Sequence, residues 1–237
     1  MDIKDLNKGI KSDDDSFYFR AKNELIIQQV SKINNKNLKI LIVGNGPSQN
    51  LKNLKKYGHV YATDINQKAL DLIPSNIFFK KMKLDISSEA KFKKNYFDVI
   101  IACDVLEHIT NDKKAVFNIC NILKKNGVVF CTVPAFQFLF SAHDSALGHK
   151  RRYSKNTLKK LFDDFKIKKL SYWNFLMFVP IAIKRALSKN SASKIDDLSK
   201  VPPIINKILY FFLKIENFLI NFVDFPFGLS LFLIAKK

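Results

Sequence analysis

Short apolar runs alternate with amphipathic segments over the first two-thirds of the chain. The apolar runs predict five β-strands, in segments 37–46, 59–66, 76–86, 97–109 and 128–134. The segments between them predict helices, at 48–58, 67–73 and 111–127, and the last shows clear helical spacing of its apolar residues. Near-continuous apolar strands separated by amphipathic helices are typical of a parallel sheet covered on both faces. We therefore expect an α/β, Rossmann-like fold.

The remaining segments complete a seven-stranded, mostly parallel sheet. Helices are expected at 16–33 and 154–165, and strands at 166–175 and 229–237. Segment 176–225 separates the last two strands and predicts two apolar helices joined by a polar linker at 188–203. We expect a single domain spanning 1–237, with an N-terminal helical extension at 1–36, a core at 38–165 and a helical insertion at 176–225.

Composition and charge narrow the class of protein. The chain has 237 residues, of which 47% are hydrophobic, and it carries a formal net charge of +19. Its three cysteines show no paired spacing and lie in apolar runs, which favours reduced thiols. The first residues have no apolar signal region, and no uncharged apolar stretch reaches about 18 residues. We expect a cytoplasmic protein.

Glycine and aspartate residues fall at the ends of three successive predicted strands. Gly44 and Gly46 follow the first strand, Asp64 the second and Asp85 the third. Parallel sheets bind ligands at these carboxyl ends, where glycine lets a ligand approach the backbone and aspartate accepts from ribose hydroxyls or an adenine amine. The third glycine of the dinucleotide fingerprint is absent. The pattern favours a nucleoside without a pyrophosphate.

Five segments within about residues 38 to 134 resemble, in order, the motif series of class I S-adenosylmethionine-dependent methyltransferases. They are ILIVGNGPS, YATDIN, KLDIS, FDVIIACDVLEHI and LKKNGVVFCTVP. Three further segments resemble a branch of these methyltransferases that acts on small molecules, the type 11/12-like branch, which is often linked to cell-envelope glycan and lipid pathways. They are SFYFRAKNELI, HDSALGHKRRYS and PFGLSLFLIAKK. The resemblance implies S-adenosyl-L-methionine as cofactor. The residues it implies in cofactor binding are Gly44, Gly46, Asp64, Ile65, Asp85, Ile86, Cys103 and Asp104.

Methyl transfer requires alignment of acceptor, methyl and sulfur, and a hydroxyl acceptor also needs a base. His143 and His149 follow the fifth strand, at the edge of the sheet that would hold the cofactor. We take His143 as the candidate base, with Asp144 and His149 as further catalytic candidates. His143, Asp144 and His149, with Glu107, are also an alternative metal site, but their spacing matches no standard ligand pattern, so we assign no metal.

A dense basic stretch lies beside these histidines. Arg151 and Arg152 are candidates for binding a phosphate or carboxylate of the acceptor, and Tyr153 for stacking on it. Tyr18 and Arg20, in the N-terminal segment that shares the resemblance, are further acceptor candidates. These residues predict a small or lipid-linked, anionic acceptor.

The insertion and the net charge leave alternatives open. Apolar helices with interspersed lysines suit an anionic membrane surface, a lid over the site or an oligomer interface, so we expect possible peripheral association with the inner face of a membrane. The basic charge also suggests an RNA methyltransferase as the alternative function, because 18 Lys and Arg against 6 Asp and Glu fall in 149–237. The chain has no recognisable RNA-binding module, which makes nucleic acid the less favoured partner.

Overall fold

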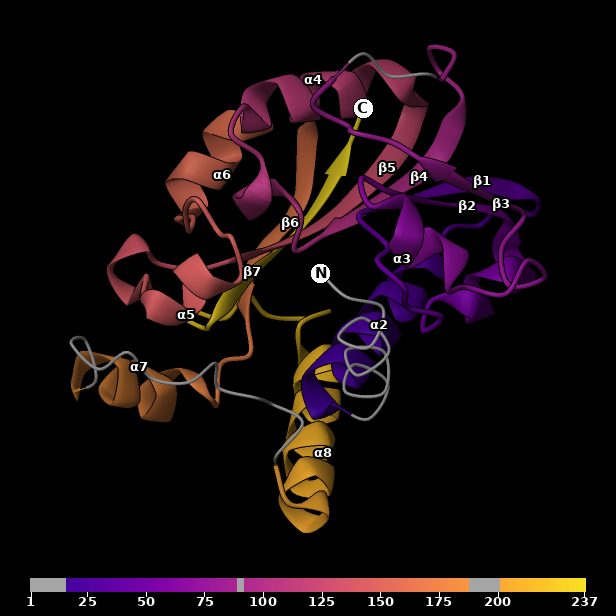
Figure 1. The fold of residues 1–237 in the computed structure, drawn as a ribbon. Helices are drawn as coiled ribbons and strands as arrows, with labels where there is room; N and C mark the ends of the chain where they lie inside the picture. The colour runs from indigo at the N-terminus through magenta and orange to yellow at the C-terminus, as the bar shows by residue number, and fades with distance from the viewer. Residues whose placement is uncertain (1–15, 89–91, 188–200) are drawn as a thin grey trace.

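The computed structural model describes residues 16–88, 92–187 and 201–237, and their strands form one seven-stranded sheet (Figure 1). The strand order is β3-β2-β1-β4-β5-β7-β6, and β7 runs antiparallel to both its neighbours. The strands are β1 (Leu38–Val43), β2 (Gly58–Asp64), β3 (Lys80–Lys83), β4 (Phe97–Cys103), β5 (Leu123–Pro134), β6 (Lys166–Trp173) and β7 (Ser230–Lys236). This is the predicted mostly parallel, Rossmann-like sheet.

Helices cover both faces of the sheet (Figure 1). They are α2 (Phe17–Val30), α3 (Gln67–Asp71), α4 (Asp112–Ile122), α5 (Ala142–Ala146), α6 (Lys155–Leu161), α7 (Phe178–Leu187) and α8 (Pro203–Leu219). Single 3₁₀ segments lie at Lys52–Tyr57, Leu106–His108 and Gln137–Leu139. No helix in the described ranges is both long enough and apolar enough to cross a bilayer.

Side-chain alternation along the strands divides the core into two layers. In β1, Leu41 and Val43 pack with residues of α4 and α6 on one face, whereas Ile40 and Ile42 pack with α2 and α8 on the other. Successive side chains of a strand point to opposite faces, so a strand buried on both faces is apolar throughout. That explains why β1 and β4 were visible as near-continuous apolar runs.

Several predicted boundaries were wrong. The segment after β1 forms a 3₁₀ turn from Lys52 rather than a helix over 48–58. Helix α4 ends at Ile122, because Leu123 is buried and pairs with Phe97 as the first residue of β5. The strand expected over 76–86 is ordered as β3 only at Lys80–Lys83, and the helix expected over 154–165 ends at Leu161. Helix α5 was not predicted, and most of the 188–203 linker lies outside the described residues.

Helix α8 is joined to the core by polar contacts on one of its faces. The Asn217 amide donates to the Ala21 carbonyl of α2 at 2.7 Å and accepts from the Trp173 indole N–H at 2.9 Å. The Glu216 carboxylate accepts from the Phe175 backbone N–H. The rest of α8 projects away from the sheet (Figure 1). The described part of the predicted insertion thus contains two helices, α7 and α8, and α8 is part of the folded body.

Candidate functional site

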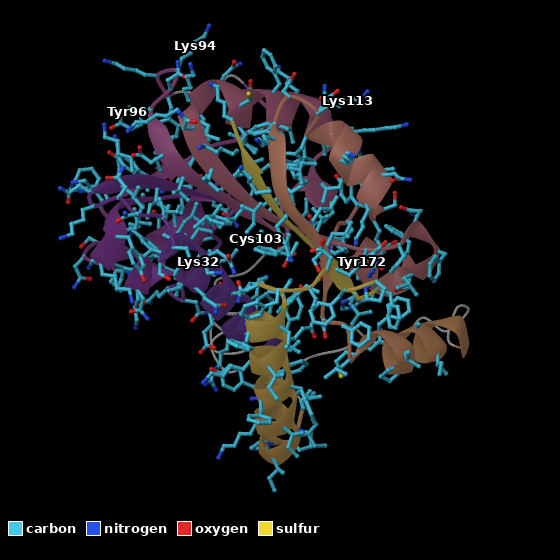
Figure 2. All side chains as sticks on the ribbon, turned by 180° about the vertical axis from the view of Figure 1, so that it is seen from behind. Lys32, Lys94, Tyr96, Cys103, Lys113 and Tyr172 are labelled. Carbon is cyan, nitrogen blue, oxygen red and sulfur yellow. The ribbon has the colours of Figure 1, made fainter. Side chains whose placement is uncertain are left out.

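A pocket of about 210 Å³ lies at the carboxyl ends of β1 and β4 and is closed on one side by α2. Figure 2 shows Cys103 at the edge of the sheet that faces α2 and α8. The pocket is lined by Phe19, Lys22, Asn23, Ile42, Val43, Gly44, Asn45, Gly46, Pro47, Ser48, Asn50, Leu51, Ile101, Cys103 and Asp104. Of the predicted cofactor residues, this set brings together both glycines with Cys103 and Asp104.

The loop after β1 has a backbone that only glycine adopts readily. Gly44 and Gly46 have φ angles of 67° and 58°, in the left-handed region. A Cβ added at Gly44 would lie 2.5 Å from Cγ2 of Val105, whereas a Cβ added at Gly46 would enter open space. Gly44 therefore permits close packing within the protein, and Gly46 leaves room beside the pocket.

Asp64 connects this loop to the end of β2. Its Oδ2 accepts from the Gly46 N–H at 2.8 Å, and its Oδ1 accepts from the Asn66 N–H at 2.8 Å. Each carboxylate oxygen keeps a further lone pair for a ribose hydroxyl. The next residue, Ile65, is an exposed apolar side chain at the same strand end. Asp64 and Ile65 thus lie beside the glycine loop, although neither lines the pocket itself.

Asp85 and Ile86 follow β3 at the same edge of the sheet. Asp85 Oδ1 accepts from the backbone N–H and the hydroxyl of Ser87, at 2.8 and 2.7 Å. Ile86 is buried, and its carbonyl accepts from the Asn118 side chain at 2.8 Å. Their places in the adenine site remain predictions.

Asp104 is held in a strained conformation at the end of β4. Its φ is 53°, which costs energy for any residue with a side chain. Its carboxylate accepts from the Thr132 hydroxyl at 2.9 Å, from Tyr18 at 3.5 Å and from the Lys22 ammonium. Burial raises the pKa of the neighbouring Cys103 thiol to about 12, so this cysteine stays neutral. Thus α2 contributes to the site.

The ion pair of Lys22 with Asp104 was not predicted. Burial is the largest single effect and lowers the pKa of Lys22, but the Asp104 carboxylate, together with Tyr18 and Cys103, raises it by more, so the net pKa lies above its ordinary value. Burial, and then the Asp104 charge, raises the pKa of Tyr18 above its ordinary range. The signal available in the sequence was the spacing of Tyr18 and Lys22, one helical turn apart on the helix that precedes the glycine loop.

The catalytic candidates after β5 are arranged differently from the prediction. The fully buried Asp144 carboxylate pairs with His149 Nδ1 at 2.9 Å and with Arg152 Nη2 at 2.7 Å. Asp144 also receives the Ser141 N–H at 3.0 Å as part of the α5 cap. His143 lies on α5, and its role as base remains a prediction.

Four acceptor candidates have partners inside the protein. Arg152 is buried against Asp144 and the Ala135 carbonyl, and Arg151 pairs with Asp112 at 2.9 Å and with the Thr110 carbonyl. The buried Tyr153 hydroxyl contacts the Leu106 carbonyl and Asp112. Arg20 stacks on the Tyr210 ring of α8 at 4.2 Å. These contacts hold the four side chains in place, and the roles of these residues and of Tyr18 in acceptor binding remain predictions.

Glu107, three residues after Asp104, is completely buried on the 3₁₀ turn that follows β4. Burial raises the pKa of Glu107 well above its ordinary value, and the Asp104 charge raises it further. His108 and His149 lie next to it, with ring centroids 4.8 Å apart at 80°. The sequence analysis placed Glu107 with His143, Asp144 and His149, but the structure groups it with His108 and His149.

The fold and the site together define a class of protein. The glycine loop, Asp64 and Asp85 lie at three adjacent carboxyl ends of a parallel sheet, and the open space at Gly46 fits a small ligand group beside the backbone. The loop has no third glycine, and a short 3₁₀ turn follows it instead of the helix N-terminus on which a pyrophosphate would rest. These residues fit S-adenosylmethionine, a nucleoside without a pyrophosphate, and define the class I methyltransferase architecture.

Comparison with known proteins agrees with this class. The family model Methyltransf_11, described as a methyltransferase domain, matches residues 41–131. The ubiquinone/menaquinone biosynthesis C-methyltransferase UbiE of Wigglesworthia glossinidia brevipalpis is 30% identical over 126 residues, 46% of this chain and 49% of that protein. The chain thus spans about half the length of the curated relative it matches.

Solved structures share the fold at low sequence identity. An S-adenosylmethionine-dependent methyltransferase from Archaeoglobus fulgidus is 16% identical with a TM-score of 0.57, over 91% of this chain and 94% of that one. Haemonchus contortus phosphoethanolamine N-methyltransferase 2, in complex with S-adenosyl-L-methionine, is 17% identical with a TM-score of 0.61, over 91% and 52%. Residues 41–131 thus match a methyltransferase domain, and the fold is that of class I S-adenosylmethionine-dependent methyltransferases.

Proposed function

We propose that this protein transfers the methyl group of S-adenosyl-L-methionine to a hydroxyl group of a small or lipid-linked acceptor. The observation that carries the proposal is the pocket, whose glycine loop lies opposite Asp104 and the Lys22 and Phe19 side chains of α2. The bound cofactor supplies an electrophilic methyl group on a sulfonium. The chain's residues have to orient the two reactants and exclude water, an effect worth about 7–11 kcal/mol in favourable cases.

Gly44, Gly46, Cys103 and Asp104 would hold the methionine half of the cofactor, Asp64 and Ile65 its ribose side, and Asp85 and Ile86 its adenine. Asp104 has its orientation fixed by Thr132 and Lys22 before any ligand binds. A preorganised carboxylate next to a positive sulfonium is electrostatically favourable. This supports a cofactor oriented toward the α2 side of the pocket, where Tyr18 lies.

A hydroxyl acceptor is favoured over an amine by the groups beside Asp104. A hydroxyl group must lose a proton during the reaction, and it therefore needs a base or a cation close by. Glu107 and the Asp144–His149 pair supply acid–base groups next to the cofactor end of β4. His143 stays the base predicted from sequence, at a position on the neighbouring helix α5.

A lipid-linked acceptor is favoured by the outward face of α8. This helix turns its polar residues Asn206 and Asn217 toward α2, and its apolar residues toward solvent. A helix of a water-exposed protein shows the opposite arrangement. The exposed apolar residues of α8 and the turn after it are Ile204, Ile205, Ile208, Phe211, Phe212, Ile215, Phe218, Leu219, Phe222 and Val223.

Lysines accompany this apolar face. Lys207 and Lys214 are exposed on α8, as on helices that lie in the headgroup region of an anionic membrane. The opposite side of α8 packs on α2, the helix that brings Lys22 and Phe19 to the pocket. A membrane surface under α8 would thus lie near the acceptor side of the site. We propose that α8 binds an anionic lipid surface.

The function is tested with S-adenosylmethionine that carries a labelled methyl group. The full chain is incubated with vesicles made from bacterial polar lipids and, separately, with an aqueous extract of sugar phosphates. Label in a lipid product that resists mild acid and base, as an ether does, supports the proposal. Label in the aqueous products alone would contradict a lipid acceptor, and product with an amine-bound methyl would contradict a hydroxyl acceptor.

A further inference from the structure

Glu107, His108 and His149 bring three metal-ligating side chains together beside the cofactor pocket. One ligand atom from each of them lies within 4.8 Å of the other two. Glu107 and His108 belong to the 3₁₀ turn after β4, and His149 follows α5 about 40 residues later. The cluster therefore forms only in the folded chain, at the end of the strand that carries Asp104.

The Glu107 carboxylate has an environment that calls for a cation. Its side chain is 0% exposed, and neither oxygen has a hydrogen-bond partner among the described residues. Burial of a carboxylate without a partner costs several kcal/mol, so such a group in a native fold requires an explanation. A positive ion bound between Glu107 and the two imidazoles would supply the missing partner.

His149 is oriented as metal-binding histidines are. Its Nδ1 is 2.9 Å from Asp144 Oδ1, and this carboxylate is itself fixed by Arg152 and the Ser141 N–H. Because the carboxylate accepts the Nδ1 proton, the lone pair lies on Nε2. A carboxylate behind the imidazole is the usual support of a histidine ligand, since it fixes the ring and raises its basicity.

His108 completes the cluster on its solvent side. The His108 ring contacts the His149 ring edge to face. His108 is exposed to solvent, whereas Glu107 is buried. The exposed side gives an ion a path of entry. It also leaves coordination positions that the protein does not fill, as in catalytic metal sites with three protein ligands.

We propose that Glu107, His108 and His149 bind one divalent first-row transition-metal ion. Two imidazoles and one carboxylate are a donor set typical of zinc and of ferrous iron, and manganese is also compatible. Ligand atoms about 2.0–2.2 Å from the ion lie roughly 3.5 Å apart, so the three side chains must approach by about 1 Å.

The site gives the ion a role that rests on the proposed function. An acceptor hydroxyl oxygen bound at an open position would have a lowered pKa, as metal-bound water does, and would release its proton to solvent. The attacking oxygen would then be held near Asp104, where the methyl donor is expected. His149 would act as a ligand with Asp144 as its positioning residue.

The test uses the full chain after treatment with a chelator, titrated with zinc or manganese chloride in a calorimeter. Wild type and Glu107→Gln are compared with His59→Gln, an exposed histidine at the start of β2. The expected result is one ion per chain for the wild type and His59→Gln, and loss of binding in Glu107→Gln. Metal should raise the thermal midpoint of the wild type and leave that of Glu107→Gln unchanged.

The proposal is overturned if the wild type binds no ion, or if Glu107→Gln binds as well as the wild type. Thermal unfolding without metal checks that the variant folds, and the variant should not be less stable, because glutamine is a neutral group of nearly the same shape and burial already disfavours the charged form of Glu107. S-adenosylhomocysteine binding, measured on the metal-free proteins, separates the two proposals. Cofactor binding without metal binding contradicts the metal site alone, whereas metal binding without cofactor binding contradicts the proposed function.

Discussion

The Lys22 ammonium forms an ion pair with the Asp104 carboxylate, and their side chains are only 7% and 24% exposed. The pair joins helix α2 to the end of β4, and both residues line the pocket that the glycine loop also lines. Helix α2 is thus part of the site rather than an appendage of the sheet. The first prediction concerns this connection.

Replacing Lys22 with methionine should destabilise the protein by about 3 kcal/mol. The substitution leaves the partly buried Asp104 carboxylate without its cation; breaking one side of a buried pair typically costs about 3–5 kcal/mol, and partial exposure of Asp104 places this loss at the lower end. Urea denaturation gives the change in the free energy of unfolding. Lys36→Met, at an exposed lysine, is the control and should have little effect. A loss below about 0.5 kcal/mol in Lys22→Met would show that the pair is unimportant to the fold.

Gly44 and Gly46 should respond differently to the same change. Alanine at either position must adopt a positive φ, which costs about 1–3 kcal/mol. Gly44→Ala adds a clash with Val105, so its main effect should be on stability. Gly46→Ala adds a methyl group in open space and should mainly weaken S-adenosylhomocysteine binding. Denaturation and calorimetry on the two variants measure both effects, and the reverse assignment would contradict the geometry.

Glu216 should make the stability depend on pH. Burial raises its pKa to about 7, and backbone N–H groups, first that of Phe175, offset only part of the shift. A raised pKa in the folded state contributes stability below the ordinary pKa of about 4.3, and this is lost as the pH rises through 7. Up to about 3 kcal/mol should be lost between pH 4 and pH 8.

Glu216→Gln is the variant that isolates this effect, because glutamine keeps the acceptor for the Phe175 N–H and does not titrate. Thermal unfolding of both proteins between pH 4 and pH 8 gives the difference in stability. The variant should gain relative to the wild type as the pH rises. A constant difference across the range would contradict the pKa of about 7.

The lipid surface proposed for α8 can be tested with a matched pair of phenylalanines. Phe218 on α8 and Phe117 on α4 are both 58% exposed, but they lie on opposite faces of the sheet. Phe218→Ser should reduce flotation with vesicles that contain anionic phospholipid, and Phe117→Ser should not. Equal flotation of both variants and the wild type, or none, would contradict the proposal. Point variants are preferable to deletion of 176–225, because Leu213 and Asn217 are buried in the core.

The sequence predicted the sheet, and it placed candidate cofactor residues at the strand ends, because both depend on local patterns. Apolar runs mark strands buried on both faces, and the polar or glycine residue that ends each run lies at the ligand edge. Gly44 and Gly46 were placed at this edge by the pattern, and Cys103 and Asp104 by the family resemblance; all four line one pocket, and their contacts with the cofactor remain predictions. The ends of elements that depend on tertiary pairing were predicted less accurately. Leu123, for example, was assigned to the helix but belongs to β5, where it pairs with Phe97.

The acceptor side could not be predicted from local patterns. Arg151 and Arg152 stand in a basic run, yet their partners Asp112 and Asp144 come from other segments, and the contact with Asp112 spans 39 positions. A run of basic residues gives no indication of which carboxylates the fold brings beside them. The same holds for Glu107 and His149, which meet only because α5 returns to the end of β4.

The central claim is that the carboxyl ends of the strands bind S-adenosylmethionine, and calorimetry with S-adenosylhomocysteine tests it most directly. The wild type should bind one molecule per chain. Asp64→Ala should abolish binding, since it removes the carboxylate that holds the Gly46 N–H and faces the expected ribose. Asp71→Ala, at an exposed position on α3, should bind as the wild type does. Absence of binding by the wild type, or unchanged binding by Asp64→Ala, would contradict the account.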